Sequence, residues 1–352
     1  MSATTGAPRV DLGAVVALRL YDIAYAIDLS RVEALGRGLA PAVARIRLQR
    51  ADPKAIAFGV PPVEFALRPL ELELGGAWRT LDATARVYDF GVVSIALRLG
   101  IEEVSWDEYV ALTNELDLAV SGESGEEIWP ALLGQVRELI APALERPADT
   151  GVEEDYLLSV VRRFDRPLTA AELLAEVDLV PLLSGETRPL SEGARNDLLR
   201  HRYSYYEDDL AVLTWDHAFL YEPSGDTDVA DVLEVANAQL LELRYYDERL
   251  DEELPRMYGR VEAARRPWRG LPLRRYANLA RSLHTVVAEV TEITERVDNA
   301  LKVTEDVYLA RIYAAALELF RVRSWADAVD RKLAIIRETY TALYDEAATV
   351  RA

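Results

Sequence analysis

The sequence predicts an α+β protein, in which a mixed α/β N-terminal region precedes a long helical C-terminal region. Up to about residue 228, β-branched and apolar stretches alternate with segments that begin at helix-capping Ser or Thr residues. From Val229 onward, apolar residues recur instead at spacings of three and four, which is typical of helices that pack along one face. We therefore expect three parts, residues 1–120, 121–228 and 229–352.

The first part holds several expected strands and one clear helix start. Residues 14–29, “AVVALRLYDIAYAIDL”, predict a strand that runs into a polar turn, with Ser30 as the N-cap of a short helix. Residues 83–99, “ATARVYDFGVVSIALRL”, form an apolar run centred on glycine and predict further strand. Ser105 then begins a helix, and Glu108 three residues later completes the pattern of a capping box.

The second part resembles the first in outline. A strand is expected at residues 153–165, and Thr169 with Glu172 forms another capping box. The segment “YDFGVVSI” (residues 88–95) can be placed over “YEDDLAVL” (residues 206–213), since each has a tyrosine, an acid, a turn-like pair and mostly apolar residues. This match favours duplication of a β-α-β-β-α unit. The alternative is that half-buried hairpins simply look alike.

The third part contains three apolar runs with heptad-like spacing, within residues 233–261, 276–300 and 329–343. Between the first two runs, the segment “RRPWRGLPLRR” (residues 265–275) contains two prolines and a glycine that interrupt a helix. We therefore expect a long antiparallel, coiled-coil-like helical hairpin with its tip at this segment, followed by a further pair of helices.

The apolar positions of these runs are candidates for self-association. One seam position is occupied by the charged Asp247, whose burial in a dry interface would be costly. It suggests a local opening, a device that fixes register, or a partner arginine. The candidate positions for a seam between helices or between subunits are Leu240, Leu243, Asp247, Leu250, Leu254, Leu283, Val290, Ile293 and Val297.

The composition excludes several classes of protein. Cysteine is absent, which rules out disulfides, zinc–thiolate sites and cysteine nucleophiles. The three histidines lie far apart in the sequence, and the formal net charge of -20 argues against indiscriminate binding of nucleic acid. No secretory signal or transmembrane stretch is visible, so we expect a cytoplasmic protein, with the inner face of the membrane as an alternative. Many arginines and few lysines are typical of a GC-rich bacterial source.

Four segments carry a resemblance to a known family. They are “YDFGVVSIALRLG”, “YSYYEDDLAVLTWDHAFLYEP”, “DVADVLEVANAQLLELRYYDERLDEEL” and “WADAVDRKLAIIRETYTALYDE”. In these segments, spread over residues 15–346, the chain resembles the required-for-meiotic-nuclear-division proteins, also called Sad-interacting-factor-like proteins. The resemblance implies an α/β domain with a helical tail, self-association and no assigned chemistry.

The same resemblance implies two further expectations. Mitochondrial members of that family are linked to the support of mitochondrial translation, and many members carry an apolar membrane anchor after the last helix. The chain shows no such segment before Ala352. Either this member is soluble, or the sequence ends before the anchor.

Residues that resemble catalytic or metal-binding groups have simpler structural interpretations. Glu207, Asp208 and Asp209 form a weak candidate for a divalent cation, but acids also belong in a turn before a strand. His217 follows Asp216 in “TWDHAF”, where the two residues are expected at a hairpin tip or a bulge. No nucleotide-binding or hydrolase motif is present. We therefore expect no catalytic residue, no resident metal and no cofactor.

The strongest candidate for a binding surface is the tip of the expected hairpin. Its arginines reverse the sign of the charge locally, and a tryptophan between them suits a membrane interface or a stacking surface. The alternative is a solvated loop with helix-end charges. The candidate residues are Arg260, Arg265, Arg266, Trp268, Arg269, Arg274 and Arg275.

These observations favour a non-enzymatic, oligomeric scaffold that associates with itself through coiled-coil faces. The alternative is a peripheral membrane organiser, or a fragment of a C-terminally anchored protein, that contacts anionic lipid through the arginine and tryptophan tip. An acidic partner protein would suit the same tip. A third hypothesis, an RNA- or ribosome-associated factor, rests on the family resemblance alone.

Overall fold

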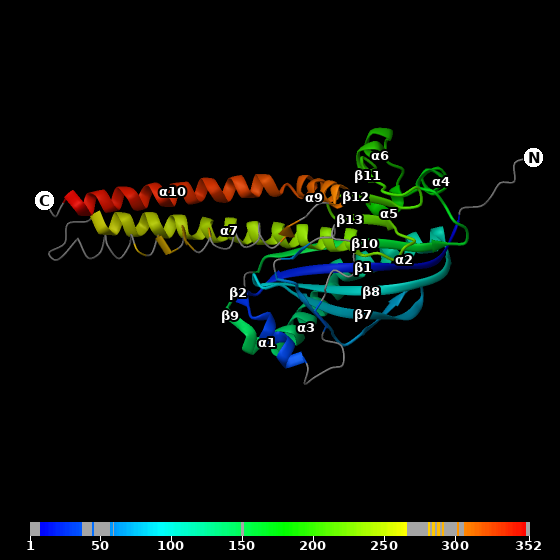
Figure 1. Ribbon diagram of the computed structural model, residues 1–352, viewed down its shortest axis with the longest axis horizontal. Helices are drawn as coiled ribbons and strands as arrows, with labels where there is room; N and C mark the ends of the chain where they lie inside the picture. Colours follow the sequence, from blue (N-terminus) through cyan, green and yellow to red (C-terminus); the bar gives the residue numbers. More distant parts are fainter. Residues whose placement is uncertain are drawn as a thin grey trace, which may run out of the picture.

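The computed structural model describes residues 8–36, 44–45, 57–58, 60–148, 151–265, 281, 284–285, 287–288, 291, 301–302 and 306–349. A sheet-rich N-terminal region is followed by long C-terminal helices, which confirms the α+β prediction (Figure 1). The strands are β1 (Arg9–Asp22), β2 (Ala24–Ile27), β3 (Ala44–Arg45), β4 (Ala57–Phe58), β5 (Val63–Ala66), β6 (Leu70–Leu74), β7 (Ala77–Val87), β8 (Val92–Ser105), β9 (Leu144–Pro147), β10 (Glu153–Phe164), β11 (His201–Tyr203), β12 (Leu210–Leu213), β13 (His217–Tyr221) and β14 (Leu301–Lys302). The helices are α1 (Leu29–Gly36), α2 (Trp106–Ser121), α3 (Glu123–Ile140), the 3₁₀ turn η1 (Ala141–Ala143), α4 (Ala170–Glu176), α5 (Val180–Ser184), α6 (Glu192–Leu198), α7 (Asp228–Arg265), α9 (Val307–Leu319) and α10 (Val322–Thr349).

The main element is a ten-stranded sheet with β1 at its middle. Its order is β11-β12-β13-β10-β1-β8-β7-β5-β3, and β6 pairs with β7 beside this path. Its neighbouring strands are antiparallel except β10 and β13, which run parallel. Residue 120 falls inside α2, and strands from both sides of it join this one sheet. The predicted domain boundaries and the predicted duplication stay predictions.

Each face of the sheet has its own apolar core, because successive strand residues point to opposite faces. On one face, α2 and α3 pack over residues such as Ile95 and Leu97. On the other face, α7, α9 and α10 pack over residues such as Leu18, Tyr156 and Leu158. The first core explains why β1 and β8 are apolar at nearly every second position. The second core ties the helical region to the sheet.

The turn between β7 and β8 requires glycine. Gly91 has φ +102°, a conformation that side-chain-bearing residues rarely adopt. A Cβ atom at this position would lie 1.8 Å from the carbonyl oxygen of Ala24. The carbonyl of Gly91 in turn accepts a hydrogen bond from the Ile23 amide at 3.1 Å. The glycine therefore lets the β7–β8 turn press against the end of β1.

Two of the predicted helix caps are confirmed, and one is wrong. Ser105 accepts a hydrogen bond from the amide three residues later, at 3.2 Å, and Thr169 forms a complete capping box. Ser30 does not cap α1, because that helix already begins at Leu29. The carboxylate of Asp28 accepts the helix-start amide hydrogen bond instead.

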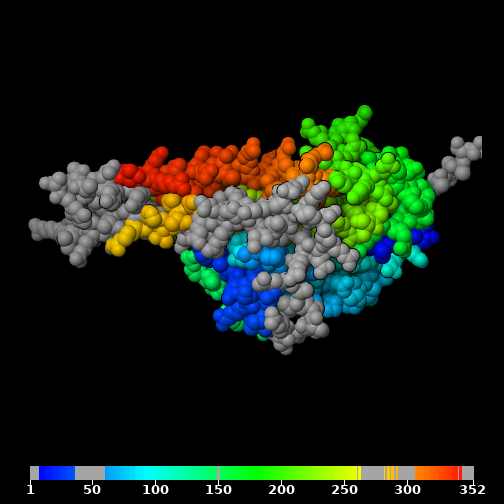
Figure 2. Space-filling view, in the orientation of Figure 1, coloured from blue at the N-terminus to red at the C-terminus, as the bar shows by residue number. Residues whose placement is uncertain are grey.

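The C-terminal helices form an arm that projects beyond the sheet (Figures 1 and 2). The two long helices of this arm, α7 and α10, run in the same direction. Tyr313, on α9, donates a hydrogen bond to Gln239 at 2.6 Å, and further along the arm Lys332 pairs with Asp247. The predicted antiparallel coiled-coil hairpin is not confirmed, because residues 266–275 of its predicted tip and most of its second helix, within residues 276–300, lie outside the described residues.

The predicted apolar seam of α7 is buried within the chain. Leu240, Leu243 and Leu250 are buried in the core with α9 and α10, and Leu254 packs against the same core. The remaining four seam candidates, Leu283, Val290, Ile293 and Val297, lie outside the described residues.

The charged seam residue of α7 is neutralised by a lysine of the same chain. Lys332 Nζ lies 2.6 Å from Asp247 and 2.7 Å from Asp251. A partner arginine was one of the expected alternatives for Asp247. The structure shows a lysine of the same chain in that role. Among the described residues, no helix is both long and apolar enough to cross a membrane.

Two buried carboxyl groups lie between the end of β1 and α7. Burial raises the pKa of Asp22 to about 7, and it raises the pKa of Glu242 well above its usual range, with the charge of Asp22 as a further cause. Both carboxyl oxygens of Glu242 are buried and lack a hydrogen-bond partner among the described residues. The fold therefore favours the protonated form of this pair.

We expect Glu242→Gln to flatten the dependence of stability on pH. A carboxyl group whose folded-state pKa exceeds its unfolded value stabilises the fold below the unfolded pKa, and this contribution is lost as pH rises through the folded pKa. The unfolding free energy of the unmodified protein should therefore fall between about pH 4 and pH 8, and that of the variant should fall less. Denaturant titrations at both ends of this range measure the difference. Glu248→Gln, at an exposed position of the same helix, should keep the original slope. Equal slopes for all three proteins would contradict the expectation.

Candidate functional site: a cavity between the sheet and helix α7

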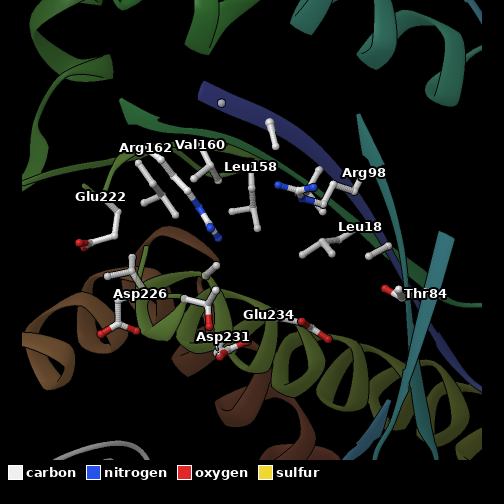
Figure 3. A pocket seen from close by; sticks show the side chains of 18 of the residues that line it. Leu18, Thr84, Arg98, Leu158, Val160, Arg162, Glu222, Asp226, Asp231 and Glu234 are labelled. Atoms are coloured by element: carbon white, nitrogen blue, oxygen red, sulfur yellow. Dashed lines mark hydrogen bonds between the residues drawn. The ribbon is translucent and has the colours of Figure 1, made fainter. Parts of the chain in front are cut away.

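A cavity of about 670 Å³ opens between the second face of the sheet and the first turns of α7. Strands β1, β8 and β10 supply its floor, and the segment from Asp226 to Glu234 supplies the facing wall (Figure 3). Leu18 and Leu158 line the cavity and also belong to the second core, so the cavity adjoins that core.

The floor of the cavity is apolar. It consists of alternate residues on neighbouring strands, which point to the same face of the sheet. Leu18 and Leu158 are fully buried, whereas Val16 and Val160 are only half-buried and keep surface that a ligand could cover. The apolar residues of the floor on these strands include Ala14, Val16, Leu18, Ala96, Leu158 and Val160.

An ion cluster centred on Arg86 fixes one edge of the cavity. The Arg86 guanidinium, on β7, lies 2.7 Å from Asp231 and 2.7 Å from Glu234, both on α7. It also contacts Glu64 at 3.2 Å, and the Tyr88 hydroxyl donates to Glu234 at 3.0 Å. These contacts clamp the N-terminal turns of α7 onto the β7 edge of the sheet.

The pKa shifts in this cluster match its pairing. Burial alone would lower the pKa of Arg86, but the carboxylates of Glu234 and Asp231 raise it well above its usual value. Burial raises the pKa of Tyr88, so the hydroxyl stays protonated and can donate. Burial also raises the pKa of Glu234, and the nearby Arg86 opposes that rise. The charge of Arg86 therefore offsets the free-energy cost of burying these carboxylates.

Two further arginines line the cavity, Arg98 on β8 and Arg162 on β10. Figure 3 shows their guanidinium groups extending over the strands on either side of Leu158. Asp226, Asp231 and Glu234 lie across the cavity from them. The cavity therefore has two arginines on its sheet side, where Asp82 and Glu222 also lie, and an acidic wall at the start of α7.

The acidic trio in the sequence does not form a metal site. Glu207 and Asp208 are exposed, whereas Asp209 is buried. The Asp209 carboxylate accepts hydrogen bonds from the amides of Tyr205 and Tyr206, at 2.7 and 3.0 Å. The trio shapes the turn before β12. Within the described part of the chain, no group of three or more His, Asp or Glu residues could hold a metal ion.

His217 lies inside the sheet rather than at a hairpin tip. The Thr214 amide donates to the His217 carbonyl at 2.8 Å, so the tip is Trp215–Asp216, one residue earlier than predicted. The side chain lies 2.8 Å from Ser159 Oγ, and burial lowers its pKa to about 3. A serine is therefore within reach, but the neutral, enclosed imidazole is a poor general base.

The arginine-rich tip lies only partly within the described residues. Arg260 and Arg265 belong to the last turns of α7. The other tip candidates, Arg266, Trp268, Arg269, Arg274 and Arg275, lie outside the described residues.

Sequence reasoning missed the cavity because its residues come from seven strands and two helices. A weak signal was present in the strand patterns. Arg86, Arg98 and Arg162 each occur within otherwise apolar stretches, “ATARV”, “IALRLG” and “SVVRRF”, at positions where alternation points them away from the first core. An arginine at such a position needs either solvent, a carboxylate or a ligand.

The comparisons with known proteins identify the family. The family model described as “Uncharacterized protein MJ0711, N-terminal domain” matches residues 12–227, so the chain belongs to that family. A curated relative, “Uncharacterized protein MJ0711” of Methanocaldococcus jannaschii, is 26% identical over 164 residues. The aligned region covers 46% of this chain and 49% of the relative, so the chain spans about half of that relative's length. No solved structure matches the chain.

This family membership overturns the resemblance to the required-for-meiotic-nuclear-division proteins. The matched family is a different one, the relative is archaeal, and nothing in the comparisons indicates a bacterial source. The segments that carried the resemblance are a tight turn, buried strands and apolar helix faces. Such patterns recur in unrelated folds because they report burial, not ancestry. The link to translation and the expected anchor lose their support with it.

We expect Arg86→Ala to destabilise the fold by about 3–5 kcal/mol, because it leaves the buried carboxylates of Asp231 and Glu234 without a cation. Denaturant-induced unfolding measures this loss. The triple variant Arg86→Met, Asp231→Asn, Glu234→Gln should regain much of it, since it removes the charges together. A single variant as stable as the unmodified protein would show that the cluster does not hold α7.

Proposed function

We propose that this protein is a binding protein for a small, largely apolar molecule, which it holds between the sheet and the first turns of α7. The observation that carries this proposal is the cavity of about 670 Å³ with an apolar floor. Ligand pockets span roughly 300–1,000 Å³ and combine apolar walls with a few polar groups. The cavity matches both criteria.

The rigidity of the cavity supports the same proposal. Its floor consists of central strands of the sheet, and the Arg86 cluster holds its α7 wall. A preformed site spends less binding free energy on ordering its own side chains. The half-buried Val16, Ala96 and Val160 offer apolar surface, and covering such surface contributes about 25 cal/mol per Å².

Binding is proposed here without catalysis. The Ser159–His217 pair is enclosed in the sheet, and its imidazole has a strongly lowered pKa. It lends no support to a hydrolytic function. The sequence expectation of a non-enzymatic protein is thus kept as part of the proposal.

We expect the full chain to bind N-phenyl-1-naphthylamine, a neutral apolar fluorophore, in a saturable manner. Val160→Trp places a large side chain in the cavity and should weaken binding at least about tenfold. Arg163→Trp inserts the same side chain at an exposed position of the same strand and should leave binding unchanged. Fluorescence titration gives both affinities, and circular dichroism confirms folding. Absence of saturable binding, or full affinity in a folded Val160→Trp variant, would refute the proposal.

Self-association is a second candidate function, in line with the scaffold expected from the sequence. What supports it is the projecting arm, which exposes Tyr258 (54%) and Ile335 (38%). The seam residues of α7 are buried within the chain, so contact between subunits would use this outer surface instead.

We expect light scattering at micromolar concentration to give a mass above that of one chain. The double variant Tyr258→Glu, Ile335→Glu should shift it to the monomer, because charges oppose burial of the arm surface. Tyr206→Glu, at an exposed tyrosine of the sheet region, should have no effect. A monomeric unmodified protein would exclude self-association. Lipid contact through the arginine-rich tip remains a separate prediction, tested by co-sedimentation with anionic liposomes.

A further inference from the structure

We infer that the molecule held in the cavity is an organic anion, whose carboxylate, sulfonate or phosphate group binds between Arg98 and Arg162 while its apolar body covers the strand floor. This inference rests on the proposed function and specifies the ligand class of the same site. It depends on three observations: the placement of the two arginines, their lack of partners, and the pairing of the acids opposite them.

The two arginines approach the cavity from either side of β1. Arg98 lies opposite Val16 in the β1–β8 ladder. Arg162 lies on β10 at an irregularity of the β1–β10 ladder, where Leu12 faces Arg163 and Gly13 faces Val161. Arg162 is therefore the extra residue of a β-bulge.

Bulges redirect side chains and are common beside binding sites. Val160 and Arg162 line the cavity, but Phe164, two residues further on, belongs to the core on the opposite face. Gly13 permits this local geometry, because a Cβ atom there would lie 3.0 Å from the Val160 carbonyl oxygen. The bulge thus ends the regular alternation of β10 where Arg162 enters the cavity.

Neither Arg98 nor Arg162 has a counter-ion among the described residues. Asp82 lies opposite Arg98 in the β7–β8 ladder, yet no ion pair joins them. Arg86, by contrast, contacts three carboxylates. The contrast is informative because acids outnumber basic residues by 60 to 40 in this chain. Arg98 is exposed and Arg162 is half-buried, so both guanidinium groups are free to bind an anion from outside the chain.

The acids on the opposite wall already have partners. Asp231 and Glu234 pair with Arg86. Asp226, which is exposed, accepts a hydrogen bond from the Asp228 amide at 3.0 Å. Of the three arginines that line the cavity, only Arg86 therefore has an ion pair among the described residues. The acidic wall repels an anion toward the arginines and so orients the ligand.

The number and type of donors suit an oxyanion. Each guanidinium offers a planar set of N–H groups that matches the oxygens of carboxylate, sulfonate or phosphate. Because Arg162 is half-buried, its charge is screened less by water than that of an exposed arginine. An apolar body on Val16, Ala96 and Val160 would place the anionic group between the two side chains.

A pair of fluorophores with the same skeleton tests the inference. 8-Anilino-1-naphthalenesulfonate carries a sulfonate, and N-phenyl-1-naphthylamine lacks it. The full chain should bind the sulfonate at least about tenfold more tightly than the neutral probe, as expected for charge-assisted hydrogen bonds. Arg98→Gln and Arg162→Gln should each weaken sulfonate binding about tenfold and leave neutral binding unchanged.

Arg163→Gln is the matched control, because Arg163 is the next residue of β10 and is largely exposed (64%). Arg163→Gln should change the affinity for neither probe. Higher salt should weaken binding of the sulfonate probe and leave binding of the neutral probe unchanged. If Arg98→Gln and Arg162→Gln bind the sulfonate like the unmodified protein, while Val160→Trp abolishes binding of both probes, the ligand class is wrong and the apolar site stands. If the unmodified protein binds neither probe, both proposals fail.

Discussion

The contact between Arg86 and the acids of α7 is the constraint on which the rest of the structure depends. A guanidinium on β7 holds two carboxylates from the first turns of α7, and the Tyr88 hydroxyl completes the contact. Removing Arg86 would leave the two buried carboxylates of α7 without a cation, which is strongly destabilising. It holds the first turns of α7 against the β7 edge of the sheet, beside the cavity.

Much of the fold could be predicted from residue spacing. The strands β1, β8 and β10 and the caps at Ser105 and Thr169 depend only on residues close together in the chain. Local sequence patterns therefore predict them. The direction of α10 relative to α7 could not be predicted in this way. An apolar seam states which face of a helix is buried but not which partner covers it, and the seam around Leu250 suits either direction.

The site was less accessible to sequence reasoning than the fold. Its cavity joins residues far apart in sequence, such as Arg98 and Arg162, through strand order, which no local pattern reveals. The acids and the histidine near residues 207–217, which resemble a site in the sequence, are turn-forming and core residues in the structure. The decisive feature, an arginine without a carboxylate, is a property of three-dimensional neighbours and appears only after the sheet is assembled.

Helix α7 forms one wall of the cavity and is also one of the two long helices of the arm. It is one helix of 38 residues, and at about 1.5 Å per residue it is about 57 Å long. Its first turns face the cavity, and its last turns lie at the far end of the arm. Because the cavity lies near one end of this helix, a small tilt there moves the other end much further. A tilt of about five degrees at the cavity would displace the distal end by roughly 5 Å, given that helix length.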